Sequence, residues 1–326
     1  MPRRLTLVTL LPFISIFCIA SDKKKDPDEI GNRDVGKGVN FYSIEKEMAL
    51  GKQLAIEVKK QAKMVDDPIV GEYVNRLGQN LARNSDAKIP VNFDIIDSDS
   101  VNAFTLPGGY VFVNSGLIRV AETEAELAAA MAHEIGHVAA RHSTRQQTRA
   151  QIANLATVPL IFLGGWTGYA VRQGASLGIP MTFLTFSRAF EGEADLLGLE
   201  YLYKAGYDPS ASIDIFERIA SLEKRKPGTV AKVFATHPMT DDRIRAAQKN
   251  ISEILPTKPE YVINTSEFNE MRVRVIALHE RQRHEERDSN RPTLHRAPGA
   301  PKPIEDGQKP QNEPDERPTL KRSQWL

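Results

Sequence analysis

Residues 123–142 read TEAELAAAMAHEIGHVAARH. Alanine has the highest helix propensity, and Thr123 followed three residues later by Glu126 forms a capping-box pattern, so we predict a helix over this stretch. His133 and His137 stand four residues apart and therefore lie on one face of the helix, one turn apart. Two imidazoles in this arrangement can bind one Zn²⁺ together, so the HExxH pattern predicts a catalytic zinc site.

The carboxylate beside the first histidine fits a catalytic role. Glu134 can reach a water molecule on the metal without being a ligand, which predicts that it is the general base. Catalytic zinc sites have three protein ligands and one open position, so a third ligand must come from elsewhere in the chain. His142 is a poor candidate because, five residues beyond His137, its side chain rotates off the ligand face.

A second acidic cluster, EGEAD at 191–195, offers the missing ligand. On a helix, Glu191 and Asp195 share one face, whereas Glu193 points nearly the opposite way. We therefore predict Glu191 as the third zinc ligand and Asp195 as the acceptor of a hydrogen bond from a ligand histidine. Glu193 is expected to be an exposed or salt-bridged carboxylate.

The composition excludes several kinds of protein. The 326 residues include 43 Lys or Arg and 42 Asp or Glu, which gives a formal net charge of +1 and no basic excess for a nucleic-acid partner. Cys18 is the only cysteine. If the N-terminus is removed, neither a disulfide nor a thiolate metal site can form, so His, Asp or Glu must hold the metal. We expect one Zn²⁺ per chain.

The first 20 residues have the features of a signal peptide. Arg3 and Arg4 precede an uncharged, mostly apolar run over 5–20 that is too short to span a bilayer comfortably, and cleavage before Ser21 would follow a small residue. A lipidated Cys18 and an uncleaved membrane anchor are the two alternatives. We expect an exported protein of the periplasm, with membrane association as a variant of that location.

Hydrophobic periodicity outside the motif predicts a mainly helical α+β fold. The spacing of apolar residues favours helices from Ser43, over 68–83, over 187–204 with Gly206 after the end, and over 209–224. Alternation of apolar and polar residues predicts short strands at 91–95, 102–106 and 110–113, with a turn at 107–109. We expect these strands to form a small antiparallel sheet beside the HExxH helix.

The sequence divides into five expected segments. They are a signal peptide (1–20), a flexible leader (21–40), a zinc metallopeptidase domain (41–258), a strand with a charged helix (259–286) and a disordered Pro-rich charged tail (287–326). The stretch 152–186 carries one charge, Arg172, inside an otherwise uncharged run up to Phe186. It predicts either buried helices with a loop over the active site or contact with a membrane surface or an apolar substrate.

Four segments, in the same order, resemble the zinc metallopeptidase family that includes the HtpX heat-shock protease, the CAAX prenyl protease and the periplasmic protease BepA. The segments are NAFTLPGGY at 102–110, HEIGH at 133–137, the stretch 187–195, and His237-Pro238. The resemblance implies a gluzincin-type zincin fold with Glu191 as the third ligand. It also implies that His237 approaches the zinc, either to stabilise the oxyanion or to occupy the open position, and that Arg243 lies near the site.

The same resemblance implies a substrate-binding strand. Within 102–114 it places an edge strand that receives an extended peptide through main-chain hydrogen bonds. The residues expected to bind substrate in this way are Gly109, Tyr110, Val111, Phe112 and Val113.

Two differences from these relatives restrict the group of family members that the chain resembles. HtpX and the CAAX protease are embedded by several membrane helices, and BepA carries helical repeats after its catalytic domain, whereas neither feature is evident in this sequence. The chain therefore resembles soluble periplasmic members without repeats. We predict a zinc-dependent endopeptidase that hydrolyses misfolded or unassembled exported proteins in quality control, with polypeptides as its partners. The alternative is an envelope chaperone or assembly factor in which proteolysis is latent or secondary.

Overall fold

The computed structural model describes residues 26–161, 186–225, 237 and 241–289. The expected signal peptide, most of the uncharged segment 152–186 and nearly all of the Pro-rich tail lie outside these residues. The chain divides into two units, residues 1–282 and 283–326, and the fold below is that of the first. Within the described ranges, no helix combines the length and apolar character needed to cross a bilayer.

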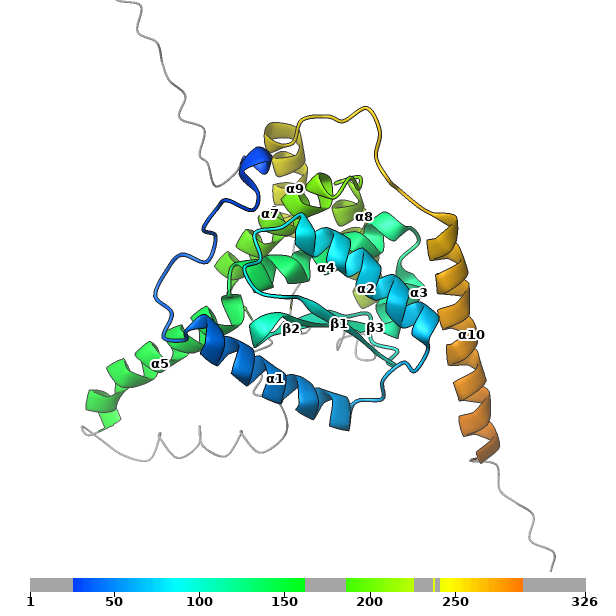
Figure 1. Ribbon diagram of the computed structural model, residues 1–326, viewed down its shortest axis with the longest axis horizontal. Coiled ribbons are helices and arrows are strands. Elements are labelled where there is room, and N and C mark those ends of the chain that lie inside the picture. The colour runs from blue at the N-terminus through cyan, green and yellow to red at the C-terminus, as the bar shows by residue number, and fades with distance from the viewer. Residues whose placement is uncertain (1–25, 162–185, 226–236, 238–240, 290–326) are drawn as a thin grey trace, which may run out of the picture. The chain divides into compact units, whose positions relative to one another are not determined.

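Helices make up most of the structure and surround one small sheet (Figure 1). In chain order the elements are η2 (Pro27–Glu29), α1 (Ile44–Gln61), α2 (Pro68–Arg83), β1 (Asn92–Ile96), β2 (Ala103–Leu106), η3 (Pro107–Gly109), β3 (Tyr110–Asn114), α3 (Ser115–Val120), α4 (Glu124–Ala139), α5 (His142–Ile161), α7 (Arg188–Lys204), α8 (Ala211–Arg225), α9 (Asp241–Ile254) and α10 (Ser266–Ser289). The predicted α+β class is therefore confirmed.

Local capping signals set several helix ends where the sequence predicts them. The Ser43 side chain accepts a hydrogen bond from a first-turn amide of α1, and Asp67 accepts from two amides after Pro68 opens α2. Ser187 caps α7 in the same way. Gly206 takes a φ of 94° just beyond the end of α7, a conformation that glycine adopts without steric cost.

The sheet is mixed rather than antiparallel, which corrects the prediction. β2 and β3 form the expected antiparallel pair, with Phe104 opposite Phe112, but β1 pairs in parallel with β3, with Phe93 opposite Val111. The strand order is β1-β3-β2, so β3 lies in the middle. The physical reason is burial. β3 is the most deeply buried of the three strands, and the central position covers it on both edges.

This strand order also corrects the substrate-binding assignment. Both edges of β3 are hydrogen-bonded within the sheet, so the main chain over 110–113 has no free edge for an incoming peptide. Gly109 lies in η3, where a Cβ would stand 2.2 Å from the Pro90 carbonyl oxygen, so it packs against backbone. The residues thereby excluded from β-pairing with substrate are Gly109, Tyr110, Val111, Phe112 and Val113. The edge strand on this side of the sheet is β2.

Side chains on the two faces of the sheet enter separate hydrophobic clusters. Val111 and Val113 belong to the larger cluster, which includes residues of α2 and α4. Phe112, between them, packs with Ala55 and Val58 of α1 in the smaller cluster, as the alternation of side chains along a strand requires. Figure 1 shows α1 on one face of the sheet and α2 and α4 on the other. The sheet therefore separates α1 from the HExxH helix α4.

The described part of the expected flexible leader, residues 26–40, is packed against the rest of the unit. The Arg33 guanidinium is buried and pairs with Asp86 and Glu200, each at 2.7 Å. Val35 joins the larger hydrophobic cluster. Because removing the cation would leave two buried carboxylates without a partner charge, this contact strongly favours the docked segment over an exposed one.

The end of the first unit also contributes to the core. The strand expected within 259–286 is a single parallel bridge between Tyr207 and Val262. α10 then follows, and its residues Phe268, Met271 and Val275 are buried in the larger cluster. The hydrophobic core therefore extends past the expected domain boundary at 258.

Candidate active site

Two glycines allow α4 and α7, the helices that carry the predicted ligands, to pack very closely. A Cβ on Gly198 would lie 2.8 Å from the Cα of His133, and a Cβ on Gly136 would lie 2.8 Å from the Ala194 carbonyl oxygen. Both distances are shorter than real Cβ contacts, so a larger residue at either position would force the helices apart. This close approach brings the histidines of α4 against the carboxylates of α7.

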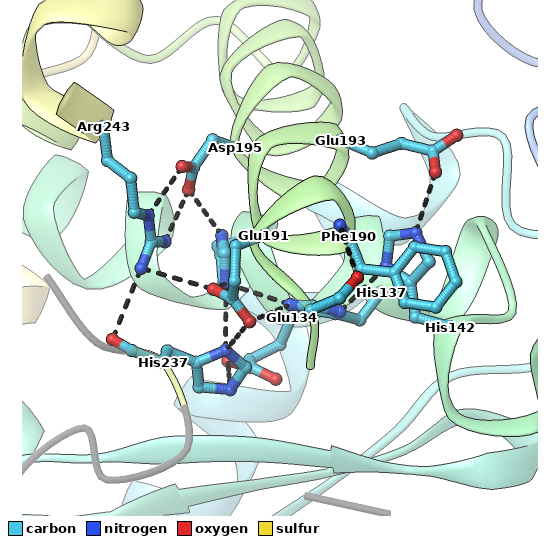
Figure 2. Close-up of polar contacts among 11 residues, drawn as sticks. Glu134, His137, His142, Phe190, Glu191, Glu193, Asp195, His237 and Arg243 are labelled. Carbon is cyan, nitrogen blue, oxygen red and sulfur yellow. Dashed lines mark hydrogen bonds and ion pairs between the residues drawn. The ribbon is translucent and has the colours of Figure 1, made fainter. Parts of the chain in front are cut away.

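Four side chains from α4, α7 and the segment before α9 converge in the interior (Figure 2). The Nε2 atoms of His133 and His137 lie 3.1 Å apart. Glu191 lies 3.5 Å from His133 Nε2 through Oε2 and 3.6 Å from His137 Nε2 through Oε1. The Nδ1 of His237 lies 2.9 Å from Glu191 Oε1 and 3.4 Å from His133 Nε2. One potential ligand atom from each of these buried residues lies within 4.8 Å of the others.

The donor set and its spacing fit Zn²⁺. Zinc binds imidazole nitrogen and carboxylate oxygen, and Zn–N bonds of ~2.0–2.1 Å in a tetrahedron place two ligand nitrogens about 3.3 Å apart. The separations of 3.1, 3.5 and 3.6 Å among the atoms of His133, His137 and Glu191 lie close to that value. These three residues could hold the ion, with His237 at the fourth position.

Burial and neighbouring charges shift the pKa values of the ligand groups in different directions. Burial disfavours the charged form of His133, but its hydrogen bonds to Asp195 and Glu191 outweigh that effect and raise its pKa to about 9. Burial and the neighbouring charge of His133 lower the pKa of His137 well below its usual value, so that ring stays neutral. Burial opposes the ionisation of Glu191, but hydrogen bonds from His133 and His237 dominate and hold its pKa far below the usual range.

Glu134 lies beside the cluster and outside the ligand set. Its side chain is buried, and its Oε1 lies 3.4 Å from His237 Nε2. Its other oxygen, Oε2, has no hydrogen-bond partner among the residues that the structure describes. Burial raises the pKa of Glu134, and the electrostatic influence of His237 and His133 offsets only part of this. A buried carboxylate with a raised pKa beside a metal site is suited to accept and return a proton.

Arg243 and Asp195 contact the potential ligand residues and hold them in position. The Nε and Nη2 of Arg243 donate to Asp195, each at 2.7 Å, and its Nη1 lies 3.2 Å from Glu191 Oε2. Asp195 Oδ1 lies 3.0 Å from the Nδ1 of His133, where the helical spacing predicts an acceptor. Arg243 also donates to the His237 carbonyl at 3.3 Å. This bidentate pairing ties α7, α9 and the His237 backbone into one network.

Comparison with known proteins identifies the group to which this site belongs. Residues 68–251, more than half of the chain, match Peptidase family M48. The chain belongs to peptidase family M48. The resemblance to zinc metallopeptidases is thereby confirmed at the level of the family, and the HExxH cluster lies inside the matched region.

Individual M48 relatives resemble the chain over most of its length. The beta-barrel assembly-enhancing protease of Escherichia coli (strain K12) is 27% identical over 281 residues, which are 84% of this chain and 57% of the relative. The putative beta-barrel assembly-enhancing protease of Vibrio cholerae is 31% identical over 268 residues, 80% of this chain and 54% of the relative. Metalloprotease LoiP of Escherichia coli (strain K12) is 31% identical over 188 residues, 57% of this chain and 73% of the relative. The chain thus spans about half the length of the beta-barrel assembly-enhancing proteases that it matches.

Most of the predicted site residues of this M48 chain meet at one place. The structure brings together His133, Glu134, His137, Glu191, Asp195, His237 and Arg243. Among the residues that the structure describes, the group of potential ligands does not include His142. The residues 109–113 do not belong to this cluster either.

Sequence reasoning missed the contacts behind His137. The Nδ1 of His142 lies 2.9 Å from His137 Nδ1, and its Nε2 lies 3.0 Å from Glu193 Oε2. α4 ends at Ala139, and Arg141 takes a φ of 54°, so the chain turns and returns the His142 ring toward His137. A helical wheel continued to His142 cannot show this. Burial is the largest influence on the pKa of His142 and lowers it.

Phe186 and Phe190, two further residues at the site, carry no local signal in the sequence. Phe186 stacks on His137 with ring centroids 4.0 Å apart, and Phe190 stacks on His142 at 4.3 Å. Their role follows from the tertiary packing alone. Gly198 does have one signal, because it lies seven residues after Glu191 and therefore on the same face of α7.

Proposed function

We propose that this M48 protein is a zinc-dependent endopeptidase that hydrolyses peptide bonds in misfolded or unassembled exported proteins. The observation that carries the proposal is the buried convergence of His133, His137 and Glu191, with Glu134 beside them. The signal-peptide features of the N-terminus support export to the periplasm. Relatives named as beta-barrel assembly-enhancing proteases support a role in the bacterial envelope.

The reaction we propose is metal-assisted hydrolysis. Zinc, when bound, activates water and polarises the scissile carbonyl. Glu134 accepts a proton from the attacking water and later returns it to the leaving amine. Its burial and raised pKa suit both steps, because the carboxyl group must hold a proton between them. Asp195 and Arg243 keep His133 and Glu191 in place throughout.

His237 has two candidate roles in this reaction. Its ring lies among the potential ligands, and its backbone carbonyl accepts a hydrogen bond from Arg243. In the first role it stabilises the negative charge that develops on the substrate oxygen. In the second it occupies the fourth position and keeps the enzyme latent until substrate displaces it. His237→Ala lowers the rate of cleavage in the first case and raises it in the second.

We place the substrate on the outer edge of β2. The Asn114 amide donates to the Asn102 carbonyl, and hydrogen-bonded pairs alternate along an antiparallel ladder. Ala103 and Thr105 therefore direct their main-chain groups away from β3, and no other described strand pairs with that edge. β2 also contacts α4, which carries Glu134. Pairing through the main chain is nearly independent of side chains and suits a protease of unfolded segments.

The test combines metal analysis and proteolysis on the same preparations. We expect the purified full chain to hold one zinc ion, to digest casein, to lose activity with a chelator and to regain it with zinc. Glu134→Gln is expected to keep the metal and to cleave ~10²–10⁴-fold more slowly, because it removes the general base. One zinc per chain with undiminished cleavage by Glu134→Gln would refute the assignment.

The same preparations distinguish a protease from an envelope chaperone or assembly factor. A chaperone would suppress the aggregation of an unfolded protein equally well in the wild type and in Glu134→Gln, with no cleavage by either. The presence of a buried general base favours the protease, because a protein that only binds substrate does not need Glu134.

A further inference from the structure

We infer that His142 and Glu193 form a hydrogen-bonded relay that fixes the tautomer and the orientation of His137 for metal binding. They are positioning residues, since neither belongs to the group of potential ligands. The inference rests on the proposed zinc site and adds two residues to its design. It also gives Glu193 a function although its side chain lies on the opposite side of α7 from Asp195 (Figure 2).

The relay runs through three helices in two short steps. The Nε2 of His142, at the start of α5, lies 3.0 Å from Glu193 Oε2 on α7. Its Nδ1 lies 2.9 Å from the Nδ1 of His137 on α4. The rings of His137 and His142 are both 0% exposed, so water does not compete for these contacts.

The placement of hydrogen atoms follows from the chemistry of the groups. The Glu193 carboxylate can only accept, so the Nε2 of His142 carries a hydrogen, and in the neutral ring its Nδ1 is a lone pair. That lone pair accepts from His137, so the His137 hydrogen is on Nδ1. The His137 Nε2 is then a lone pair, and it faces the Nε2 of His133 at 3.1 Å, where the metal would bind. The opposite tautomer of His137 would put a hydrogen into the metal site.

The surroundings hold each member of the relay in position. Arg145 Nη1 donates to Glu193 at 3.2 Å and to the Ala140 carbonyl at 3.0 Å, so it links the carboxylate to the end of α4. Phe190 stacks on the His142 ring with centroids 4.3 Å apart and planes at 21°. A relay member with fixed neighbours can hold His137 at the angle that a metal ligand needs.

The two α4 histidines thus receive parallel support from one helix. Asp195 of α7 pairs directly with the Nδ1 of His133, from which its Oδ1 lies 3.0 Å away. Glu193, two residues earlier, supports the Nδ1 of His137 through His142. Ligand histidines commonly have a carboxylate or carbonyl partner behind them, and loss of that partner weakens metal binding roughly 10–100-fold.

Two substitutions at one position separate hydrogen bonding from packing. His142→Phe keeps a flat ring to stack on Phe190 but removes the acceptor, and we expect the zinc dissociation constant to rise roughly 10–100-fold, measured by competition with a chromogenic chelator. His142→Asn loses the ring but places Oδ1 where the Nδ1 of His142 stood, and we expect it to retain most of the affinity. A packing role predicts the reverse order, and that order would overturn the inference.

A matched pair at Glu193 tests the second step. Glu193→Gln keeps an oxygen acceptor for His142, and Glu193→Met keeps the length of the side chain without an acceptor. We expect zinc affinity close to wild type in the first and clearly weaker in the second. Equal affinity in both variants would overturn the role of Glu193.

The unaltered protein provides a readout that does not depend on the folding of a variant. Long-range ¹H–¹⁵N spectra of the metal-free full chain report the tautomer of each histidine. We expect the hydrogen of His137 on Nδ1 and that of His142 on Nε2, and the opposite tautomer of His137 would overturn the inference. Failure of the wild type to bind zinc would refute the proposed function and the relay together. Tight zinc binding by the wild type and by both His142 variants would refute the relay alone.

Discussion

The backbone of His133 lies directly against Gly198, so that a Cβ on the glycine would stand 2.8 Å from both the Cα and the amide nitrogen of the histidine. The first predicted ligand and the helix of the third ligand are thus in contact through their main chains. The geometry of the metal site depends on this contact, because a shift of α7 would carry Glu191 and Asp195 away from α4 together.

Gly198→Ala is expected to destabilise the protein by about 1–3 kcal/mol through overpacking and to weaken zinc binding. Urea unfolding and chelator competition would measure the two effects. The matched control is Gly192→Ala on the same helix, where no atom lies within 4 Å of an added Cβ. It should be neutral or stabilising by up to ~1 kcal/mol, since alanine is the better helix former. Equal effects of the two substitutions would contradict the close-contact argument.

Arg243→Lys is expected to reduce zinc affinity by roughly 10–100-fold, because an ammonium group cannot reproduce the bidentate contact with Asp195 that holds His133. Metal titration would show this. Arg245→Lys, in an exposed ion pair two residues away, serves as the control and should leave affinity unchanged. Wild-type zinc affinity in Arg243→Lys would show that the contact between Arg243 and Asp195 does not contribute to metal binding.

Thr105→Pro is expected to lower kcat/KM for casein while zinc content stays at the wild-type level. Proline removes the amide that Thr105 directs to the outer edge of β2, where we place the substrate, and leaves the ladder with β3 intact. Phe104→Pro on the same strand would instead remove an amide that pairs with β3, so a loss of thermal stability is expected there. Unchanged kcat/KM in Thr105→Pro would exclude this edge as the substrate strand.

Glu200→Gln is expected to flatten the dependence of stability on pH. Burial raises the pKa of Glu200 from 4.5 to about 7, against the opposing charge of Arg33. Between pH 4.5 and about 7 the folded protein retains a proton on Glu200 that the unfolded chain has lost. Glu200 therefore makes the free energy of unfolding fall as the pH rises through this range. This pKa shift changes the free energy of unfolding by about 3 kcal/mol at most.

Urea unfolding of wild type and Glu200→Gln at pH 5 and at pH 7.5 would test this. All other titrating groups are common to both proteins, so the difference between their pH dependences isolates Glu200. Parallel curves for the two proteins would mean that the buried carboxyl does not titrate in this range.

The sequence predicts those parts of the fold that depend on neighbouring residues. Asp67 and Pro68 specify the start of α2, and the HExxH spacing places two imidazoles on one face of α4 whatever surrounds them. That Glu191 and Asp195 share a face likewise follows from their spacing along one helix. Both residues reach the α4 histidines as expected.

Features that depend on contacts distant in the sequence could not be predicted in this way. The order β1-β3-β2 reflects which strand is buried most deeply, and short alternating segments do not reveal that ranking. The return of His142 to His137 depends on a φ of 54° at Arg141. That conformation is rare for a non-glycine residue, and the paired contacts of Arg141 with Glu47 and the Tyr42 carbonyl hold it.

The docking of Arg33 has a consequence for any shortened version of this protein. The family match covers 68–251, but the cation between Asp86 and Glu200 comes from outside that region, as do the buried side chains of Phe268, Met271 and Val275. A fragment cut to the matched residues would keep both acids and lose their common counter-ion, and it would expose the apolar surface that α10 covers. A fragment of this protein that keeps these contacts therefore begins before Arg33 and ends after Val275.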